Sequence, residues 1–506
     1  MPATLFKKIL VANRSEIAVR VMNGCRVLGI PSVAVYSEAD VNSKHRLYAD
    51  ESVLIGPPPP TESYLDIDKI IDVARQTGCD AIHPGYGFLA ENPALPRRCA
   101  KENITFIGPG AEAMELMGNK ITSRQKMENA GIPIIPGMKA SGESLAAFEA
   151  AAEKTGYPVL IKAAAGGGGK GMRIVYARED LSASLEAAQR EAKSAFGDDT
   201  AYLEKYIANP RHIEFQIIAD NHGNCVHLFE RECSIQRRHQ KIIEETPSVA
   251  LNDELRHRMG EDAVKVAQTA GYTNAGTVEF LFGENNTYYF LEMNTRLQVE
   301  HPITEFVTGV DLVVEQIRVA AGLPLSQNLE QLTQRGHAIE CRIYAEDGEN
   351  NFFPSTGKII HYSEPVGPGI RVDSGVSSGT EITIDYDPIM AKLIVHAPDR
   401  ATAISKMTDA LHNYKLLGVR TSKKLMIDVL RHPEFVAGNT YTNFIEKHMS
   451  ERSTDQAAYR EIAAAVASVA AISTSTPLVS SNSVQSAAPS PWQTLGQWEI
   501  GDSIHV

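Results

Sequence analysis

Strand and helix patterns alternate along the first part of the chain. Apolar runs and helical periodicity predict a strand, a helix and a second strand, at 7–14, 15–29 and 31–37. Ser15 is a residue type suited to a helix N-cap, and Gly29 is suited to the C-terminal end of the same helix. Strand–helix–strand units of this kind favour a doubly wound parallel sheet, which we expect for residues 1–118.

The remainder of the chain changes character twice. A helix is expected at 119–133, and strands and helices near 400–412 and 420–431 favour a mixed α+β region toward the C-terminus. A Ser/Ala/Pro-rich stretch then has the composition of a linker. We therefore expect an N-terminal domain, a central domain containing a smaller unit, a C-terminal domain and a tail, at 1–118, 119–336 with 134–205, 337–450 and 451–506.

A glycine run in "LIKAAAGGGGKGMR" (160–173) is the first candidate for binding phosphate. It does not fit the G-x-x-x-x-G-K-[ST] pattern, because glycine follows the lysine. It fits G-x-G-x-x-G, but that motif needs a following helix, whereas "MRIVYA" alternates like a strand. The loop is therefore predicted to join two strands as a lid over phosphates. A plain surface hairpin remains the alternative, although Lys120 and Lys162 supply the positive charge that a polyphosphate requires.

A second candidate is a predicted hairpin in "TVEFLFGENNTYYFLEMN" (277–294). Asn285 and Asn286 suit a two-residue type I′ turn, and counting back from them places Glu279 directly opposite Glu292. Opposed carboxylates repel unless a cation lies between them. With Asn294 on the same face, they form an oxygen cluster suited to Mg²⁺. A solvent-facing acidic edge is the alternative, and the aromatic neighbours argue against it.

Charged residues also gather immediately downstream of the hairpin. Arg296 and Glu300 lie four residues apart in "RLQVEH", so a cation for an anionic substrate and a carboxylate base would adjoin the metal. "RECSIQRRHQK" (231–241) is strongly basic, although a run of this kind is often a solvated face.

Composition narrows the class of protein. The 506 residues include 43% hydrophobic and 22% charged positions, which is ordinary for a globular protein. The net charge of −13 argues against a general nucleic-acid binder. The sequence contains no apolar run long enough to span a membrane and no secretory leader, so a cytoplasmic location is expected. The six cysteines form no C-x-x-C pair, which makes zinc and disulfide interpretations weak.

An ordered series of motifs resembles the biotin carboxylase family, ATP-grasp enzymes that carboxylate carrier-bound biotin. The motifs run from about residue 6 to 448 and include "ANRSEIAVR", "HPGYGFLAENP", "GGGGKGMR", "EKYI", "RECSIQRRHQK", "EMNTRLQVEH" and "ECRIYAED". The resemblance implies an α/β ATP-grasp fold with an N-terminal doubly wound parallel-sheet (Rossmann-like) domain, a glycine-rich lid subdomain and a C-terminal mixed α+β domain. Ser15 departs from the family pattern, which has glycine there.

The resemblance also implies roles for individual residues. ATP would be held by residues of the central domain: Lys120, Lys162, Gly168, Gly169, Glu204, Lys205, Tyr206, Ile207, His212, Gln236 and His239. Mg²⁺ or Mn²⁺ would be held by Glu279, Glu292 and Asn294. Lys241, Arg296 and the backbone of Val299 would bind bicarbonate, which Glu300 would deprotonate, and Arg342 would stabilise the ureido oxygen of biotin.

Partners follow from the same resemblance. The biotinylation motif "AMKM" is absent from this sequence, so biotin is expected on a separate carrier protein or domain. The expected partners are a second copy of the chain, a biotin carboxyl carrier protein and a carboxyltransferase subunit, with no nucleic acid or membrane. Acetyl-CoA or a similar acyl-CoA is the expected final acceptor, and pyruvate is the alternative. Another bicarbonate-activating ATP-grasp ligase or a non-catalytic nucleotide-binding protein is the rival interpretation.

The tail carries both tryptophans, Trp492 and Trp498. Large aromatic residues after a linker indicate that this segment either docks on a partner or folds back on its own chain.

Overall fold

The computed structural model describes residues 5–138, 144–163, 171–237, 240–326, 329–348, 350, 352–449 and 463–468. The chain separates into two compact units, Met1–Glu451 and Arg452–Val506, and in the second unit residues 463–468 form a short helix. Trp492 and Trp498 lie outside the described residues. None of the described helices combines the length and apolar character that crossing a bilayer requires.

The N-terminal region is a five-stranded sheet in the order β3-β2-β1-β4-β5, and every strand pair is parallel. Its strands are β1 (Ile9–Val11), β2 (Ser32–Ser37), β3 (Glu51–Gly56), β4 (Ala81–His83) and β5 (Thr105–Phe106). Its helices are α1 (Ser15–Val27), α2 (Lys44–Tyr48), α3 (Ile67–Thr77), α4 (Ala94–Lys101) and α5 (Ala111–Gly118). The predicted doubly wound parallel sheet is confirmed.

Successive residues of β1 explain why both faces of this sheet are covered. Ile9 and Val11 pack in one core with α1, whereas Leu10 packs in a second core with α3. Because side chains alternate along a strand, a fully apolar strand needs a layer on each side. The short apolar run at Ile9–Val11 therefore indicates a strand that is buried on both faces.

The start of α1 differs from the expectation. The N-cap residue is Arg14, and Ser15 is the first helical residue with φ 60°, so the predicted Ser15 cap is wrong. Gly375 lies so close that a Cβ added to it would come within 2.1 Å of the Ser15 hydroxyl oxygen. This tertiary contact overrides the local capping preference, and the left-handed backbone accounts for glycine in the family pattern. Gly29 follows the helix with φ 70°, as predicted.

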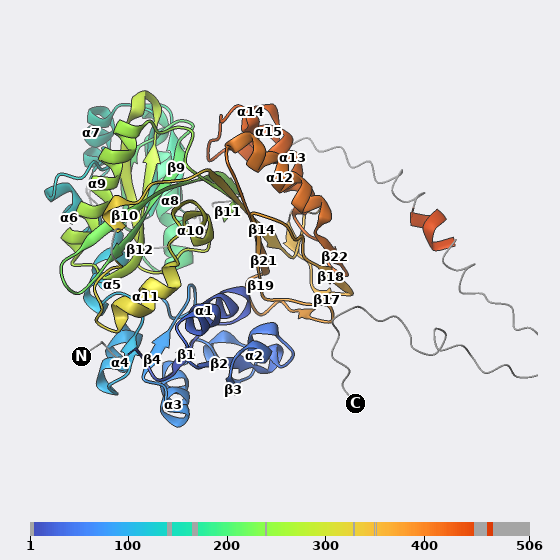
Figure 1. Ribbon diagram of the computed structural model, residues 1–506. Coiled ribbons are helices and arrows are strands. Elements are labelled where there is room, and N and C mark those ends of the chain that lie inside the picture. Colours follow the sequence, from blue (N-terminus) through green and yellow to red (C-terminus); the bar gives the residue numbers. More distant parts are fainter. Residues whose placement is uncertain are drawn as a thin grey trace, which may run out of the picture. The chain divides into compact units, whose positions relative to one another are not determined.

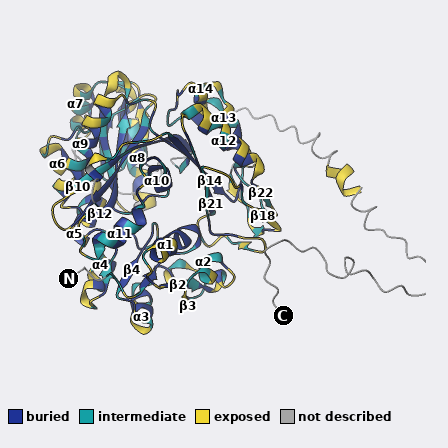
Figure 2. Ribbon diagram, viewed as in Figure 1, coloured by how far each residue is buried: buried dark blue, intermediate teal, exposed yellow. Residues whose placement is uncertain are grey.

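The centre of the molecule is an eight-stranded antiparallel sheet in the order β13-β12-β9-β10-β11-β14-β21-β19 (Figure 1). Its strands are β9 (Arg211–Ala219), β10 (Cys225–Arg237), β11 (Gln240–Thr246), β12 (Asn274–Phe282), β13 (Tyr288–Asn294), β14 (His337–Tyr344), β19 (Ile370–Ser374) and β21 (Ile389–Ala397). Pairing of β11 with β14 carries the sheet from the central region into the C-terminal region. The strands are largely buried, and the helices around them expose their outer faces (Figure 2).

Helices and short strands complete these two regions. The helices are α6 (Lys120–Asn129), α9 (Asp253–Ala270), α10 (His301–Thr308), α11 (Leu312–Ala320), α12 (Arg400–Asn413), α13 (Lys423–Arg431), α14 (Pro433–Val436) and α15 (Phe444–His448). The short strands are β15 (Glu346–Asp347), β16 (Phe353–Pro354), β17 (Gly357–Lys358), β18 (His361–Ser363), β20 (Glu381–Ile382) and β22 (Lys415–Leu417). The helices predicted near 400–412 and 420–431 correspond to α12 and α13.

The predicted lid forms a separate three-stranded sheet, β7-β6-β8. It consists of β6 (Val159–Ala163), β7 (Arg173–Val175) and β8 (Ala201–Lys205), with α7 (Leu145–Thr155) and α8 (Leu181–Phe196). Strands β6 and β7 pair antiparallel, which confirms that the glycine run joins strand to strand. Gly168 and Gly169 themselves lie outside the described residues.

The predicted hairpin of β12 and β13 forms, but its strands pair in a different register near the turn. Asn285 and Asn286 have φ of 55° and 57°, as a type I′ turn needs, but the adjoining pair is Phe282 with Tyr288. The predicted register is therefore one residue wrong at the tip. A bulge then shifts the pairing by one residue between Glu279 and Phe280. Glu279 therefore lies opposite Glu292, as predicted.

Candidate functional site

A row of charged residues crosses four neighbouring strands of the central sheet. Glu279 on β12 is the register partner of Glu214 on β9 and of Glu292 on β13, and Glu214 also lies opposite Arg231 on β10. Directly opposed residues place their side chains on the same face of a sheet. The sheet thus presents three carboxylates and one guanidinium in a line.

Lys241, on β11, neutralises the middle of this row. Its ammonium lies 2.5 Å from Glu214, 3.0 Å from Glu279 and 2.7 Å from Glu300. Burial by itself lowers the pKa of Lys241, but the three carboxylates outweigh it and hold the pKa well above the ordinary value. Lys241 is therefore charged, and three acids that would otherwise repel one another converge on it.

Glu300 lies at the start of α10, where it is the N-cap residue, and its side chain is fully buried. Its carboxylate accepts hydrogen bonds from Lys241 at 2.7 Å and from Arg342 at 2.9 Å. Burial opposes ionisation, but Lys241 and Arg342 outweigh it, so that the pKa of Glu300 lies well below its usual value. The structure thus brings together Lys241, Glu300 and Arg342, which the sequence places on three separate segments.

The acids of this region outnumber its cations. Arg342 also binds Glu244 at 2.6 Å, and Glu244 lies opposite the fully buried Glu340 on the next strand. Burial raises the pKa of Glu244 to about 7, although Arg342 opposes this. Burial likewise raises the pKa of Glu340 well above its usual value. Glu244 and Glu340 can therefore retain a proton near neutral pH, on the side of the site away from Glu279.

His212 and Gln236 extend the site toward the expected nucleotide position. The Nε2 atom of His212 lies 2.8 Å from Glu279, and its Nδ1 atom is 3.0 Å from the Gln236 amide nitrogen. Burial opposes ionisation of Glu279, but Lys241 and His212 outweigh it and hold its pKa below the usual range. Glu279 is therefore an ionised oxygen donor. His239 lies outside the described residues.

The expected metal ligands share one corner of the sheet. Asn294 donates to Glu279 at 2.7 Å, and Glu292 lies opposite Glu279 with its side chain 38% exposed. Among the described residues, the ligand atoms that converge most closely are those of His212, Glu214 and Glu279, and those of Glu214, Cys233 and Glu300. Glu292 belongs to neither group. A cation held by Glu279 and Glu292 would therefore lie at the exposed end of the row.

Three cations lie near two carboxylates on the lid side of the site. Lys162 donates to Glu204 at 2.8 Å, and Arg124 binds the other oxygen of the same carboxylate. Lys120 lies 3.5 Å from Glu292. Burial, followed by the charges of Lys120 and Arg124, lowers the pKa of Lys162 to about 8. An excess of positive charge of this kind is suited to a polyanion.

The segment expected to contact adenine continues from β8. Lys205 donates its backbone N–H to Pro136 and its ammonium to Gly156, while Tyr206 donates its backbone N–H to Pro158. These bonds fix the position of Ile207 next along the chain. Glu204 is buried, and its side chain binds Lys162 and Arg124, which leaves its backbone as the part of the residue that could contact adenine.

Arg296 is oriented by three polar neighbours rather than by the Lys241 cluster. Its guanidinium binds Glu91 at 2.9 Å, and Asn294 and Gln298 each at 3.1 Å. Val299 accepts a hydrogen bond at its carbonyl oxygen, from Lys392 at 2.9 Å.

Several residues of the cluster were missed by the sequence reasoning: Glu91, Glu214, Arg231, Glu244 and Gln298. Glu214 and Glu244 occupy fully buried positions within apolar strand segments, "HIEFQ" and "IIEET". A charged residue in an otherwise apolar strand was the available signal, because such a charge is rarely buried without a partner.

Three family models match the chain in order. They are the biotin carboxylase N-terminal domain over residues 5–114, the carbamoyl-phosphate synthase L chain ATP-binding domain over 119–328, and the biotin carboxylase C-terminal domain over 340–447. The flanking models distinguish this chain from carbamoyl-phosphate synthases, with which it shares the ATP-binding domain.

Similar proteins come from several biotin-dependent carboxylases. A pyruvate carboxylase subunit from Methanothermobacter thermautotrophicus is 55% identical over 444 residues, covering 88% of this chain and 90% of that protein. Biotin carboxylase 1 of Bacillus subtilis is 50% identical over 88% of this chain and 99% of its own length. The alpha subunit of mitochondrial methylcrotonoyl-CoA carboxylase from Dictyostelium discoideum is 48% identical over 98% of this chain and 71% of its own length.

Solved structures agree with these sequences. Biotin carboxylase from Campylobacter jejuni, in complex with β,γ-ATP, has a TM-score of 0.84 and 46% identity, covering 88% of this chain and 99% of that one. The biotin carboxylase domain dimer of Hydrogenobacter thermophilus 2-oxoglutarate carboxylase, in complex with MgADP, ADP and bicarbonate, has a TM-score of 0.84 and 47% identity, covering 89% and 100%. The ATP-grasp fold is thereby confirmed, and the chain belongs to the biotin carboxylase family of ATP-dependent ligases.

Proposed function

We propose that this chain uses ATP to activate bicarbonate and carboxylates biotin on a carrier, as the first half-reaction of an acyl-CoA carboxylase. The observation that carries the proposal is the contact of Lys241 with Glu214, Glu279 and Glu300, with Arg342 bound to the same Glu300. Such an arrangement holds a small oxyanion beside a carboxylate base.

ATP would bind between the lid and the hairpin. Lys120, Arg124 and Lys162 supply positive charge for its phosphates, and relief of their mutual repulsion favours a polyanion there. Gly168 and Gly169 of the lid and His239 would contact the nucleotide as well. Lys205, Tyr206 and Ile207 would contact the adenine, with His212 and Gln236 nearby. The Campylobacter jejuni relative was solved as a complex with β,γ-ATP, which supports ATP as the nucleotide.

The donor set at the hairpin fits a divalent cation. Glu279 is ionised, Glu292 lies opposite it, and the two carboxylates together with Asn294 offer the hard oxygen atoms that Mg²⁺ or Mn²⁺ prefers. When bound, the cation would neutralise charge on the phosphates. The distance of 3.5 Å between Lys120 and Glu292 supports phosphates that lie next to this cation.

Bicarbonate would bind at Lys241, Arg296 and the backbone N–H of Val299. An arriving anion draws the charge of Lys241 toward itself and weakens its hold on Glu300. The pKa of Glu300, which these cations depress in the free protein, then rises toward the range of a useful base. Glu300 accepts the bicarbonate proton in this arrangement.

The bond changes then follow in order. The bicarbonate oxygen attacks the γ-phosphorus of ATP and displaces ADP, giving carboxyphosphate, which breaks down to CO₂ and phosphate. The phosphate accepts the N1′ proton of biotin, and N1′ forms the new bond to CO₂. Arg342 stabilises the negative charge on the ureido oxygen while this happens. Closure of the lid excludes water from carboxyphosphate.

The share of this chain that each relative matches bears on the final carboxyl acceptor. The methylcrotonoyl-CoA carboxylase relative matches 98% of this chain, whereas the pyruvate carboxylase relative matches 88% despite its higher identity. The longer match favours an acyl-CoA carboxylase, with a biotin carboxyl carrier protein and a carboxyltransferase as partners. Pyruvate remains the second candidate because of the 55% identity.

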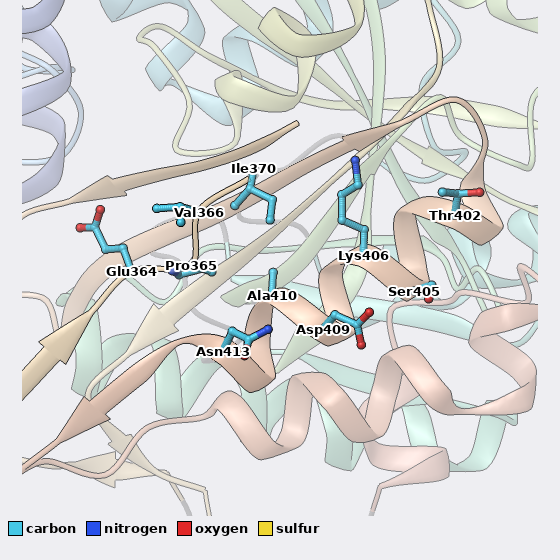
Figure 3. A pocket seen from close by; sticks show the side chains of 10 residues that line it. All are labelled: Glu364, Pro365, Val366, Ile370, Thr402, Ser405, Lys406, Asp409, Ala410 and Asn413. Atoms are coloured by element: carbon cyan, nitrogen blue, oxygen red, sulfur yellow. The ribbon is translucent and has the colours of Figure 1, made fainter. Parts of the chain in front are cut away.

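A second copy of the chain would cover an apolar face of the C-terminal region. A groove of about 510 Å³ lies between α12 and the segment before β19, lined in part by Pro365, Val366 and Ile370 (Figure 3). Val366 is 88% exposed, and Val27 at the end of α1 is 71% exposed. The related Hydrogenobacter domain was solved as a dimer, which supports a second copy as the occupant of this exposed apolar face.

Replacing Glu300 by Gln keeps the shape of the side chain but removes the base. Biotin-dependent carboxylation, measured by fixation of labelled bicarbonate, is expected to fall by about 10²- to 10⁴-fold. ATP binding, measured by calorimetry, is expected to stay within twofold. Glu305→Gln, a change at another ion-paired carboxylate of the same helix, is the matched control and should retain carboxylation. Carboxylation at the wild-type rate in Glu300→Gln would contradict the assigned base.

Replacing Glu292 by Gln should weaken the cation site without disturbing the fold, because the side chain is partly exposed. The Mg²⁺ concentration for half-maximal ATP binding is expected to rise about tenfold, since losing one carboxylate removes roughly 1–4 kcal/mol of attraction. Glu284→Gln, at the exposed tip of the same hairpin, should leave this concentration unchanged. Equal Mg²⁺ dependence in both variants would exclude Glu292 as a ligand.

Purification of the full chain from its native cells should recover a biotinylated carrier and a carboxyltransferase. The recovered complex is expected to carboxylate an acyl-CoA in preference to pyruvate, measured as label transferred from bicarbonate. A preference for pyruvate would assign the chain to the second candidate.

Placing a charge on the apolar face should separate the two copies. Val366→Glu is expected to shift the mass measured by light scattering from dimer to monomer, because the carboxylate would lose its hydration at the interface. Val436→Glu, at an exposed valine on α14, is the control and should remain dimeric. A dimer that persists in Val366→Glu at the same concentration would place the interface elsewhere.

A further inference from the structure

Lys392 is a buried cation that the proposed chemistry does not use. It lies on β21, its side chain is 0% exposed, and its ammonium donates to the Val299 carbonyl oxygen at 2.9 Å. The same ammonium is 3.3 Å from a Glu16 oxygen and 3.7 Å from an Asp373 oxygen. One side chain therefore connects α1, β19 and β21 with the turn that precedes α10.

The sheet register pairs Lys392 with a residue already assigned to the site. Lys392 lies directly opposite Arg342 on β14, so both side chains leave the same face of the sheet. Arg342 binds the carboxylate of Glu300, and Lys392 binds the carbonyl of the residue before it. Two neighbouring cations thus hold the side chain and the main chain of one turn.

The bond to Val299 has a defined geometric effect. The Val299 carbonyl belongs to the planar peptide that links Val299 to Glu300. Fixing this carbonyl fixes the plane, and with it the direction in which Glu300 leaves the backbone. A hydrogen bond from a charged donor is stronger than one between neutral groups, so this contact favours one orientation of the peptide.

The ammonium of Lys392 lies closer to the Val299 carbonyl oxygen than to the carboxylate of Glu16 or Asp373. In the described part of the chain, neither carboxylate oxygen of Glu16 has a hydrogen-bond partner. Burial raises the pKa of Glu16 to about 7 even though Lys392 opposes this. Buried charges with incomplete pairing contribute little to stability, and a packed apolar side chain would often serve the fold equally well. The placement of Lys392 is accounted for better by the carbonyl that it binds.

We propose that Lys392 is a positioning residue for bicarbonate activation, fixing the plane of the Val299–Glu300 peptide so that the Glu300 carboxylate is directed at the anion. This inference rests on the roles of Val299 and Glu300 in the proposed function. Lys392 touches no substrate in this account and acts through the backbone of the turn.

Lys392→Met removes the ammonium and keeps the length of the side chain. The kcat/KM for bicarbonate is expected to fall about 100-fold, as a small misplacement of a reacting group can cause. ATP affinity, measured by calorimetry, is expected to remain unchanged, because Lys392 contacts none of Lys120, Arg124 and Lys162, the cations proposed to bind its phosphates. Lys423→Met is the matched control: Lys423 also donates to a backbone carbonyl, that of Tyr414, but on α13. The control should retain the bicarbonate kcat/KM.

A double variant separates positioning from charge balance. Glu16→Gln with Lys392→Met removes the cation together with the acid it would leave unpaired, so the melting temperature is expected to recover relative to Lys392→Met. The bicarbonate kcat/KM is expected to stay low. Recovery of both quantities to wild-type values would overturn the proposal, since Lys392 would then serve only to balance charge.

Glu300→Gln distinguishes failure of this inference from failure of the proposed function. If Glu300→Gln abolishes carboxylation while the double variant has the wild-type kcat/KM for bicarbonate, the base is retained and the positioning role of Lys392 is refuted. If Glu300→Gln is fully active, the role of Glu300 as the base in the proposed function fails, and the inference fails with it.

Discussion

The attraction of one ammonium for three buried carboxylates is the interaction on which the site depends. Glu214, Glu279 and Glu300 come from two strands and the start of a helix, and Lys241 is within 3.0 Å of each. Without that charge the acids would repel one another in a poorly hydrated interior. In the proposed function, bicarbonate competes for the same ammonium. The cohesion of the free site and the proposed recognition of its substrate would then rely on the same group.

Local patterns in the sequence predict the fold further than they predict the site. The apolar strands and periodic helices of residues 1–118 show in the sequence because burial imposes them residue by residue. The pairing of Glu279 with Glu292 in the hairpin was also predicted. It holds because the one-residue shift near the turn is offset by the bulge between Glu279 and Phe280. Glu214 and Glu244 were missed because their partners come from distant strands. Ser15 was misassigned because the contact with Gly375, 360 positions later, decides its backbone.

The sheet order explains why distant motifs meet. Pairing of β11 with β14 brings Lys241 and Glu244 next to the strand that carries Arg342. Pairing of β9 with β12 places Glu214 beside Glu279. The expected boundary at 336–337 therefore passes between strands that are neighbours in one sheet. His212, Lys241, Glu279 and Arg342, which the proposed function assigns to nucleotide, bicarbonate, metal and biotin, all extend from this one sheet, which fixes their mutual distances.

The lid has its own sheet, which shares no described strand with the central one. Its core, built from residues such as Phe148, Val159 and Leu203, is separate from the cores beneath the central sheet. Substitutions among the apolar residues of this small subdomain can therefore accumulate over evolution without repacking the cores beneath the central sheet.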